Sequence, residues 1–480
     1  MVDGSQVSVS IDAQAASDAA LGADTLTLYL QLLTGEFMEQ HLRQAKVRQN
    51  NRLYNPLVVI WLMVFQRLHG NVSMERAAAN MAHGLPAAFW PRPCKRRRED
   101  QVSSNDGSYS TARQELPLSV VEQSANRVLE GLLEQTGGAA PVFGRRALFV
   151  DGTSLRTPHR PKLNKKFPPS SNQHGESHWP IVKMLVAHDL ETGLAMHPVM
   201  CFQLLHQWGA MSGSKAVSEQ ALFEKLLREG VPAGAIMVGD INFGVFSVAY
   251  AADQRKHPVV LRMQPQRARA LLGEPLVDGI DREVEWQPSK DERKSHPELP
   301  ADACVRGRLL VTLVQPDNGA EAFLLALFTT LSNAEASRED LMKVYGKRWN
   351  IEVDLRTLKS LLQLEQLSST TPDMVAKEIH AAMITYNLVR AAMCAAAAQE
   401  GIPPRSYSFA GVRDVMEHFQ PFIAAAKTPE EAQALTDKMM RCVRQKKLHK
   451  RKRGRSYPRE VWGRPRTFPA RKREKGTSTA

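Results

Sequence analysis

Two acidic residues of this sequence each follow a short apolar run, a position from which a carboxylate can do chemistry. Asp151 ends the run at 145–151, and Asp240 ends the run at 235–240. Such runs are typical of buried strands in an open α/β sheet, which binds its ligands outside the carboxyl ends of the strands. Two carboxylates brought together there would hold a divalent metal ion through hard oxygen ligands. A single Asp in this position is more often a turn or capping residue.

A third acid, Glu352, belongs to a polar stripe. Tyr345, Arg348, Glu352 and Lys359 stand at offsets of 0, 3, 7 and 14 residues. On one continuous helix they fall within an arc of about 60°, so a phenol, a carboxylate and two cations share one face. An adjoining apolar stripe can pack this helix down: Ile351, Leu355, Leu358 and Leu362. A solvated face is the alternative, in which the cations pair with Glu352 or with neighbouring acids.

Helical and strand-like patterns alternate along the chain and predict the elements that position these residues. Helical spacing is found at 25–48, 56–67, 73–81, 120–135 and 217–229, and again from 336 onward. Strand-like runs are found at 145–151, 180–188, 194–202, 235–240, 259–263, 309–314 and 322–330. We therefore predict an α/β core preceded by a helical region and interrupted by a mostly β segment. The predicted units are 1–140, helical; 141–255, first part of the core; 256–331, β-rich insertion; 332–435, second part of the core; and 436–480, basic tail.

Positive charge is concentrated at one end of the sequence. The chain of 480 residues has a formal net charge of +13. Residues 441–480 hold 16 Lys and Arg against 2 acidic residues, whereas residues 1–440 hold 47 against 48. The tail also contains Tyr457, Trp462 and Phe468 and lacks an amphipathic period, which favours non-specific binding to the DNA backbone. A solubilising appendage is the alternative, and the basic run at 95–98 has the same two interpretations.

Several classes of protein are disfavoured by composition. The longest apolar run, 57–65, is far shorter than the roughly 20 residues that span a bilayer, so we expect no membrane association. The N-terminus has neither the basic start nor the apolar core of a signal peptide. The 5 cysteines form no CxxC pair, which argues against a disulfide framework and a zinc ribbon and suits a cytoplasmic protein.

The spacing of Tyr345, Arg348, Glu352 and Lys359 resembles the Y-R-E-K motif of insertion-sequence transposases of the IS-four family, a branch of the DDE superfamily. Other segments are similar to the family as well: 110–116, 151–153, 239–243, 329–331, 372–375, Glu378, 386–390 and 457–459. The likeness covers about 110–460 well and the first helices more loosely. One departure follows the second Asp, where relatives often carry Arg-Gly and this chain has Ile241 and Asn242.

The resemblance implies a ribonuclease-H-like catalytic core in which Asp151, Asp240 and Glu352 form a catalytic triad that binds two Mg²⁺ ions, with Mn²⁺ as a possible substitute. It implies a transposase that cleaves and joins double-stranded DNA at terminal inverted repeats, working as a homodimer in a synaptic complex, in the cytoplasm and associated with the nucleoid. The region 1–140 would then recognise the transposon ends. A metal-dependent nuclease without strand transfer and a catalytically inactive DNA-binding protein are the alternatives.

The resemblance also suggests DNA contacts beyond the metal site. Arg348 and Lys359 would hold phosphates, and Tyr345 would hydrogen-bond a phosphate oxygen. Trp286, in the β-rich segment, would stack on a flipped base, although a core position is the alternative. His174 and His178 form an HxxxH pair, but neighbouring Gly, Pro and Ser residues indicate a loop rather than a zinc-binding helix.

Overall fold

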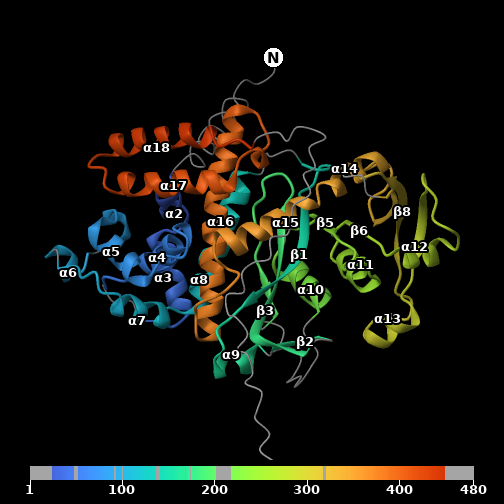
Figure 1. The fold of residues 1–480 in the computed structure, drawn as a ribbon, viewed down its shortest axis with the longest axis horizontal. Helices are drawn as coiled ribbons and strands as arrows, with labels where there is room; N and C mark the ends of the chain where they lie inside the picture. Colours follow the sequence, from blue (N-terminus) through green and yellow to red (C-terminus); the bar gives the residue numbers. More distant parts are fainter. Residues whose placement is uncertain are drawn as a thin grey trace, which may run out of the picture.

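A mixed β-sheet with helices packed around it is the central feature of the computed structural model (Figure 1). The structure describes residues 24–47, 52–90, 93–99, 101–136, 141–167, 169–172, 175–201, 218–316 and 321–448. The basic tail beyond residue 448 and His174 lie outside the described residues, so the DNA-binding prediction for the tail and the HxxxH interpretation are not addressed by it.

The N-terminal region is helical, as its periodicity predicts. Its helices are α2 (Thr25–Leu32), α3 (Gly35–Gln44), α4 (Pro56–Leu68), α5 (Met74–Gly84), α6 (Lys95–Arg98), α7 (Gly107–Glu115) and α8 (Leu118–Gln135), with a short 3₁₀ turn η1 (Ala87–Phe89). The predicted helix at 25–48 is divided in two. The Oγ1 of Thr34 accepts a hydrogen bond from the backbone N–H of Phe37 at 3.2 Å, which caps the second helix and ends the first.

The sheet follows the order β2-β3-β1-β5-β6-β9-β8-β7, with β4 paired to β3. Its strands are β1 (Ala147–Arg156), β2 (Pro169–Asn172), β3 (Gly175–Asp189), β4 (Val199–Met200), β5 (Ile236–Gly239), β6 (Val259–Arg262), β7 (Asp281–Trp286), β8 (Val305–Val314) and β9 (Phe323–Thr329). Strands β1, β5 and β6 are parallel, and the outer strands run antiparallel to their neighbours. The mixed α/β architecture expected from the alternating pattern is therefore present.

The segment 256–331, expected as an inserted β unit, does not form a separate sheet. Its first strand, β6, pairs in parallel with β5, and β9, β8 and β7 continue the same sheet outward. The polar stretch that separates its strands forms a short helix, α13 (Lys290–Ser295), because Ser289 and Glu292 make a capping box. The boundary at 256 therefore falls within one continuous sheet.

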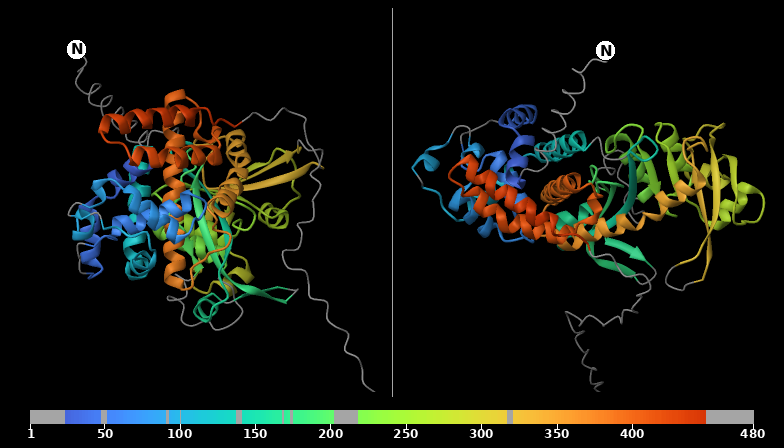
Figure 2. Two further views of the ribbon diagram at one scale, coloured as in Figure 1. Left: turned by 60° about the vertical axis from the view of Figure 1, so that its left-hand side comes forward. Right: turned by 90° about the horizontal axis from the view of Figure 1, so that it is seen from above.

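The remaining helices cover the sheet and join it to the N-terminal region. They are α9 (Pro161–Lys166), α10 (Glu219–Glu229), α11 (Phe246–Asp253), α12 (Pro265–Leu272), α14 (Arg338–Gly346), α15 (Trp349–Arg356), the π-helical turn η3 (Thr357–Leu361), α16 (Pro372–Glu400), the 3₁₀ turn η4 (Pro404–Ser406), α17 (Phe409–Ala424) and α18 (Pro429–Arg444). Helix α16 stands between the N-terminal helices and the sheet in all three views (Figures 1 and 2).

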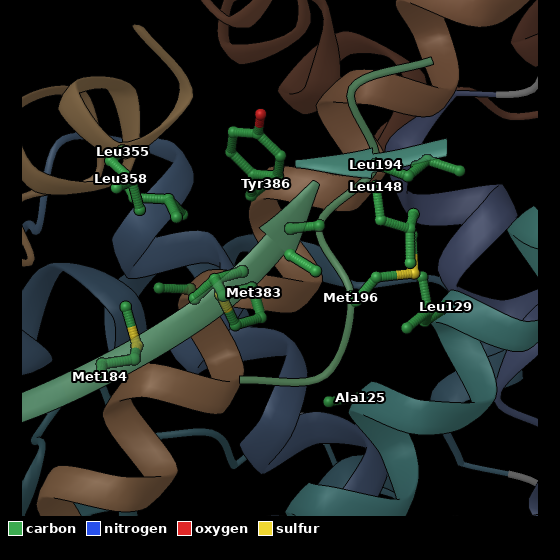
Figure 3. Close-up of a cluster of buried hydrophobic side chains, with 14 of the residues drawn as sticks. Ala125, Leu129, Leu148, Met184, Leu194, Met196, Leu355, Leu358, Met383 and Tyr386 are labelled. Atoms are coloured by element: carbon green, nitrogen blue, oxygen red, sulfur yellow. The ribbon is translucent and has the colours of Figure 1, made fainter. Parts of the chain in front are cut away.

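Helix α16 forms the centre of the hydrophobic core. Met383 and Tyr386 on α16 face Met184 and Leu148 of the sheet, and Leu129 of α8 completes the cluster (Figure 3). Among the described helices, α16 alone is long and apolar enough to cross a membrane, yet 94% of its most apolar window is buried inside the protein. Its apolar length is therefore accounted for by a core position.

Candidate active site

Asp151 and Asp240 come together where β1 and β5 stop pairing. The last parallel pair between these strands is Val150 with Gly239, so the next residues along both strands are the two aspartates. The prediction that Asp151 ends its strand is wrong in one detail, because β1 continues to Arg156 by pairing with β3. The strands thus diverge at the two carboxylates.

Burial and like charge act together on Asp151. The pKa of Asp151 is raised to about 6, mainly by burial; the charges of Asp240 and Glu219 add to the rise, whereas a hydrogen bond from the N–H of Gly152 and the charge of Arg348 oppose it. That N–H lies 2.7 Å from Oδ1 of Asp151. Charges of the same sign this close to one another destabilise the ionised state, and a bound cation would relieve the repulsion.

Asp240 is held by the turn that follows it. Its Oδ1 accepts a hydrogen bond from the backbone N–H of Asn242 at 2.9 Å, and its carbonyl oxygen accepts one from the N–H of Phe243 at 3.1 Å. Phe243 is fully buried, and a Cβ at Gly239 would lie 2.8 Å from the Cβ of Phe243, so this turn requires glycine there. The chain thus forms, with Ile241 and Asn242 after the second Asp, a turn that orients Asp240.

Glu352 lies in the first turn of α15, a helix that packs against β1. The continuous helix expected from Tyr345 to Lys359 is not formed. Helix α14 ends at Gly346, Lys347 and Arg348 form a turn, and the chain passes into the π-helical turn η3 after Arg356. A π turn changes the angle between successive residues around the helix axis. The arc of about 60° predicted for Tyr345, Arg348, Glu352 and Lys359 on one continuous helix therefore does not apply to all four residues.

Arg348 forms an ion pair with Glu352, with 2.7 Å between Nη2 and Oε1. Burial lowers the pKa of Arg348, but the hydrogen bond and the charge of Glu352 outweigh it, so this pKa lies above its ordinary value. The charge of Arg348 also acts on Asp151 and Asp240, which places the ion pair beside the two strand-end carboxylates. In this structure Arg348 therefore adopts the ion-paired alternative.

Tyr345 is 6% exposed, and its hydroxyl lies beside the guanidinium of Arg262, which hydrogen-bonds to it. Burial raises the pKa of Tyr345 to about 12, while the nearby charges of Arg348 and Arg262 lower it. Asp240 also acts on this hydroxyl. The hydroxyl of Tyr345 therefore lies near Arg262, Arg348 and Asp240, inside the protein rather than at its surface.

Lys359 and Trp286 differ in how far they lie from the surface. Lys359 is half-buried on η3, one turn beyond the helix that carries Glu352.

Trp286 is 4% exposed and lies edge-on against Phe328 at 4.9 Å and Phe246 at 6.0 Å between ring centroids. In this structure the indole of Trp286 therefore takes the core alternative, packed against β9 and α11, and its stacking on a flipped base stays a prediction.

A buried charge cluster anchors α15 from behind. Asp354, two residues after Glu352, is 0% exposed and pairs with Arg390 of α16 and with Arg405, whose Nη2 lies 2.8 Å from Oδ2. Arg405 also donates to the carbonyl oxygens of Asp189 and Leu190. These bonds connect the helix of Glu352 to α16 and to the turn after β3.

The carboxylates of Asp151, Asp240 and Glu352 are ligands of the type that a hard divalent cation prefers. In this structure the three do not surround a common point. Among the described residues, no three His, Cys, Asp or Glu side chains stand close enough together to hold a metal ion as they are. Glu352 is occupied by Arg348, whereas Asp151 and Asp240 repel each other side by side. All three carboxylates could hold a metal ion only if Glu352 left Arg348 and moved toward Asp151 and Asp240.

Two further polar residues reach this site that the sequence patterns did not single out. Glu219 is the first residue of α10, and burial together with the charge of Asp240 raises its pKa. Arg262 is the last residue of β6, one position beyond the pairing of Gly239 with Leu261, which places it next to Asp240. Strand order could have indicated Arg262, because β6 also ends at this edge. No local pattern distinguishes Glu219 from an ordinary first-turn acid.

Comparisons with known proteins match this part of the chain to transposases. The family model for the transposase DDE domain matches residues 142–388. Transposase InsG for insertion sequence element IS4 of Escherichia coli (strain K12) is 26% identical over 272 residues, which are 55% of this chain and 56% of that protein. This chain thus spans about half the length of that curated relative. A solved piggyBac transposase synaptic complex with hairpin DNA matches with a TM-score of 0.41 and 12% identity over 87% of this chain and 81% of that chain, a likeness too weak to argue from.

Proposed function

Because the chain belongs to the transposase DDE-domain family, whose members cleave and transfer DNA strands with divalent metal ions, we propose that it cleaves and joins DNA strands at the ends of a transposable element. The observation that carries this proposal is the meeting of Asp151 and Asp240 at the point where β1 and β5 diverge, with Glu352 on a helix packed against β1. These three residues are the proposed catalytic triad.

The strand arrangement supports a ribonuclease-H-like core as the finer description of this fold. Strand β3 runs antiparallel to β1, and β1, β5 and β6 run parallel to one another. Two carboxylates stand at adjacent strands and the third on a later helix. In this arrangement 256–331 extends the sheet outward from β6 and separates the second acid from the third.

We propose Mg²⁺ as the physiological ion, two per site, with Mn²⁺ as a substitute. When bound, two such ions supply activation of the attacking oxygen and stabilisation of the leaving oxygen in an in-line displacement at phosphorus. Asp151, Asp240 and Glu352 would hold them through carboxylate oxygens. Water would be the nucleophile for cleavage, which breaks a phosphodiester and leaves a 3′-hydroxyl and a 5′-phosphate. The freed 3′-hydroxyl would be the nucleophile for joining, in which one phosphodiester forms as a phosphodiester of the target breaks and leaves a hydroxyl.

Cations beside the triad would position the scissile phosphate. When Glu352 turns to the metal site, the guanidinium of Arg348 becomes available, and a phosphate oxygen is the natural replacement for the lost carboxylate. Lys359 would add a second positive charge to the backbone of the same strand, and the buried hydroxyl of Tyr345 would donate to a phosphate oxygen. In this proposal the Arg348–Glu352 ion pair exists before DNA and metal bind. On binding, Arg348 would contact a phosphate and Glu352 would contact the metal.

Replacing Arg348 with Gln is expected to weaken binding to end DNA at least about tenfold and to lower cleavage further. A charge-assisted contact to phosphate is lost, and one contact of this kind contributes about 1.5–3 kcal/mol. The free energy of unfolding should change by less than about 1 kcal/mol, because the ion pair is partly exposed. DNA binding by fluorescence anisotropy and thermal melting measure the two effects.

Lys343→Gln is the matched control, since Lys343 is exposed on α14 and pairs only with its own helix at Asp340. Equal losses of DNA affinity in both variants would indicate a general effect of charge and would contradict a specific role for Arg348.

The proposed partners are the terminal inverted repeats of the element and a target duplex, bound by a homodimer that pairs two ends. The region 1–140 is the proposed end-recognition region, and the basic tail is proposed to raise affinity for the DNA backbone in a salt-dependent way. We propose a cytoplasmic location in association with the nucleoid.

A strand-transfer assay with purified protein, Mg²⁺ and duplexes carrying the element's terminal repeats tests the function. We expect both nicking at the repeat ends and joined products, with neither formed when the metal is chelated by EDTA. Cutting without joining would favour a metal-dependent nuclease. Binding of the repeats without any cutting, in Mg²⁺ and in Mn²⁺, would favour the catalytically inactive DNA-binding protein.

A further inference from the structure

A cavity of about 490 Å³ lies where the N-terminal helices meet the start of α16, and we call it the α16 cavity. Helices α4, α5 and α7 contribute to one side of it, and residues between 368 and 381, which lead into α16, form the other. Among the described residues that line it, none belongs to the sheet that carries Asp151 and Asp240. Its volume is typical of sites that hold a small molecule or one group of a larger ligand.

Hydrogen-bond donors and positive charge characterise the lining of the α16 cavity. Arg67 and Arg113 supply guanidinium groups, whereas Glu378 is the one acidic residue among the described residues that line it. Side-chain hydroxyls come from Ser73, Ser110, Ser368, Ser369, Thr370 and Thr371. Such a lining favours a ligand that accepts several hydrogen bonds and carries negative charge.

The carboxylate of Glu378 is already engaged within the protein. It is buried and pairs with Arg67, whose guanidinium also donates to two backbone carbonyl oxygens at 362–363. The oxygens of Glu378 also accept hydrogen bonds from the backbone N–H of Ser368 at 3.3 Å and of Ser369 at 3.2 Å. Burial raises the pKa of Glu378, but the charge of Arg67 and these hydrogen bonds outweigh it, so this pKa lies below its ordinary value. Arg67 and Glu378 thus neutralise each other.

The guanidinium of Arg113 has no comparable partner. Its Nη1 donates to Oε1 of Gln66 over 3.4 Å, and its Cζ lies 5.4 Å from the ring centroid of Tyr109. Its Nε is buried without a hydrogen-bond partner in the described part of the chain. The carboxylate whose pKa its charge affects is that of Glu378, which is paired with Arg67.

Arg113 therefore leaves one positive charge in the lining that no carboxylate of the lining balances. The charge of Arg113 also acts against the charged form of Arg67. A partly buried cation without a counter-charge is unfavourable, and a bound anion would balance it. The N-termini of α5 and α16 lie at the same cavity, and their dipoles favour an anion as well.

We propose that the α16 cavity binds a phosphate group, with Arg113 supplying the charge and the surrounding hydroxyls of Ser110 and Thr370 donating to phosphate oxygens. Phosphate offers several oxygens that accept charge-assisted hydrogen bonds, which complements this lining. A phosphodiester of the DNA backbone is the expected source, and this part of the inference rests on the proposed function. Free inorganic phosphate is the other source with the same chemistry. The site is separate from the proposed triad and from the basic tail.

Binding of duplex DNA to the full-length protein at several salt concentrations tests the backbone contact. Because a phosphate contact does not depend on sequence, we expect Arg113→Gln to weaken binding of a terminal-repeat duplex and of an unrelated duplex alike, by about tenfold at low salt. The slope of log affinity against log salt concentration should become shallower by about 0.9, the value for one lost phosphate contact. Fluorescence anisotropy measures both quantities, and thermal melting checks that each variant is folded.

Thr370→Glu is the second variant, because it keeps Arg113 and its packing against Tyr109. Thr370 is exposed at the edge of the cavity, so the new carboxylate can pair with Arg113 without disturbing the core. We expect this variant to weaken DNA binding to a similar extent.

Two variants on α3, outside the cavity, make the same changes of charge. Arg43→Gln removes an exposed arginine that pairs with Glu39 of its own helix, and Gln40→Glu adds an exposed carboxylate. Both should bind DNA within about twofold of the wild-type protein. Losses in these controls as large as those in the cavity variants would indicate a general effect of charge and would overturn this inference.

Isothermal titration calorimetry with inorganic phosphate, without DNA, distinguishes the two sources. Phosphate binding that is lost in Arg113→Gln and Thr370→Glu, together with unchanged DNA affinity, would assign the cavity to free phosphate. Unchanged DNA affinity and salt slope in both variants, with no phosphate binding that depends on Arg113, would overturn this inference. Weakened DNA binding in both variants of a protein that neither cuts nor joins DNA would contradict the proposed function alone.

Discussion

Asp151→Asn is expected to abolish strand cleavage while making the folded protein more stable. The variant loses a proposed metal ligand, and we expect cleavage to fall at least about 10³-fold, equivalent to about 4 kcal/mol in the barrier. It also removes a charge that burial and the neighbouring Asp240 and Glu219 disfavour in the folded state. Near neutral pH the gain in unfolding free energy should reach at most about 3 kcal/mol.

The gain in stability should depend on pH in a defined direction. The pKa of Asp151 is raised from 3.8 to about 6 on folding, so the unfolded chain releases this proton at lower pH than the folded one. Stability of the wild-type protein therefore falls as pH rises from about 4 to about 6, and the loss is complete above that interval. Asn cannot ionise, so the advantage of the variant should appear over the same interval and vanish below about pH 4.

Thermal unfolding at several pH values, with and without Mg²⁺, measures this effect. Added Mg²⁺ should stabilise the wild-type protein more than the variant, because a bound cation neutralises the repulsion that Asn has already removed. Asp437→Asn, an exposed acid on α18, is the control and should show neither effect. A variant that is less stable than wild type at neutral pH, or that still cleaves DNA, would contradict the assignment of Asp151.

Asp354→Asn is expected to destabilise the protein by about 3–5 kcal/mol, the cost typical of removing one partner from a buried ion pair. Arg390 would remain almost fully buried without its carboxylate, and Arg405 would keep only its bonds to backbone carbonyls. Two arginines hold the pKa of Asp354 below its ordinary value in spite of complete burial, so the charged form is the one on which the fold depends.

Denaturant unfolding measures this loss, and Asp414→Asn provides the control. Asp414 is exposed and pairs with Arg413, so its replacement should change the unfolding free energy by less than about 1 kcal/mol. Because Asp354 anchors the helix that carries Glu352, cleavage should also fall at temperatures well below the melting transition. Similar unfolding free energies for the two variants would show that the buried cluster does not stabilise α15.

Much of the fold could be predicted from the sequence because its signals are local. Apolar runs at 145–151 and 235–240 correspond to β1 and β5, and Pro56 after Asn55 marks the start of α4. Periodicity and caps report the conformation of a few neighbouring residues, which is why these elements were correctly typed. The metal-binding role of the triad stays a prediction, whereas the adjacency of Asp151 and Asp240 follows from the strand pairing.

Other features were beyond sequence reasoning because they depend on contacts between distant segments. The regular spacing from Tyr345 to Lys359 suggested one helix, yet a turn at Arg348 and a π turn at η3 interrupt it. The sequence leaves both a base-stacking role and a core position open for Trp286, and in the structure Trp286 is buried against Phe328. Residue types and spacing do not distinguish an interrupted helix from a continuous one, or a buried Trp from an exposed one. Both depend on which side chains pack against the folded sheet.

The sequence by itself determined the chemical repertoire of this protein: carboxylates after apolar runs, a Tyr-Arg-Glu-Lys spacing, and a positive charge concentrated in the tail. Tertiary structure alone decided which of these groups meet. Strand order placed Asp151 beside Asp240, and the missing Cβ of Gly152 admitted Glu219 to the same site. The physical reason is that side-chain identity is local, whereas the electrostatics of a site depend on distances that only the packed chain defines.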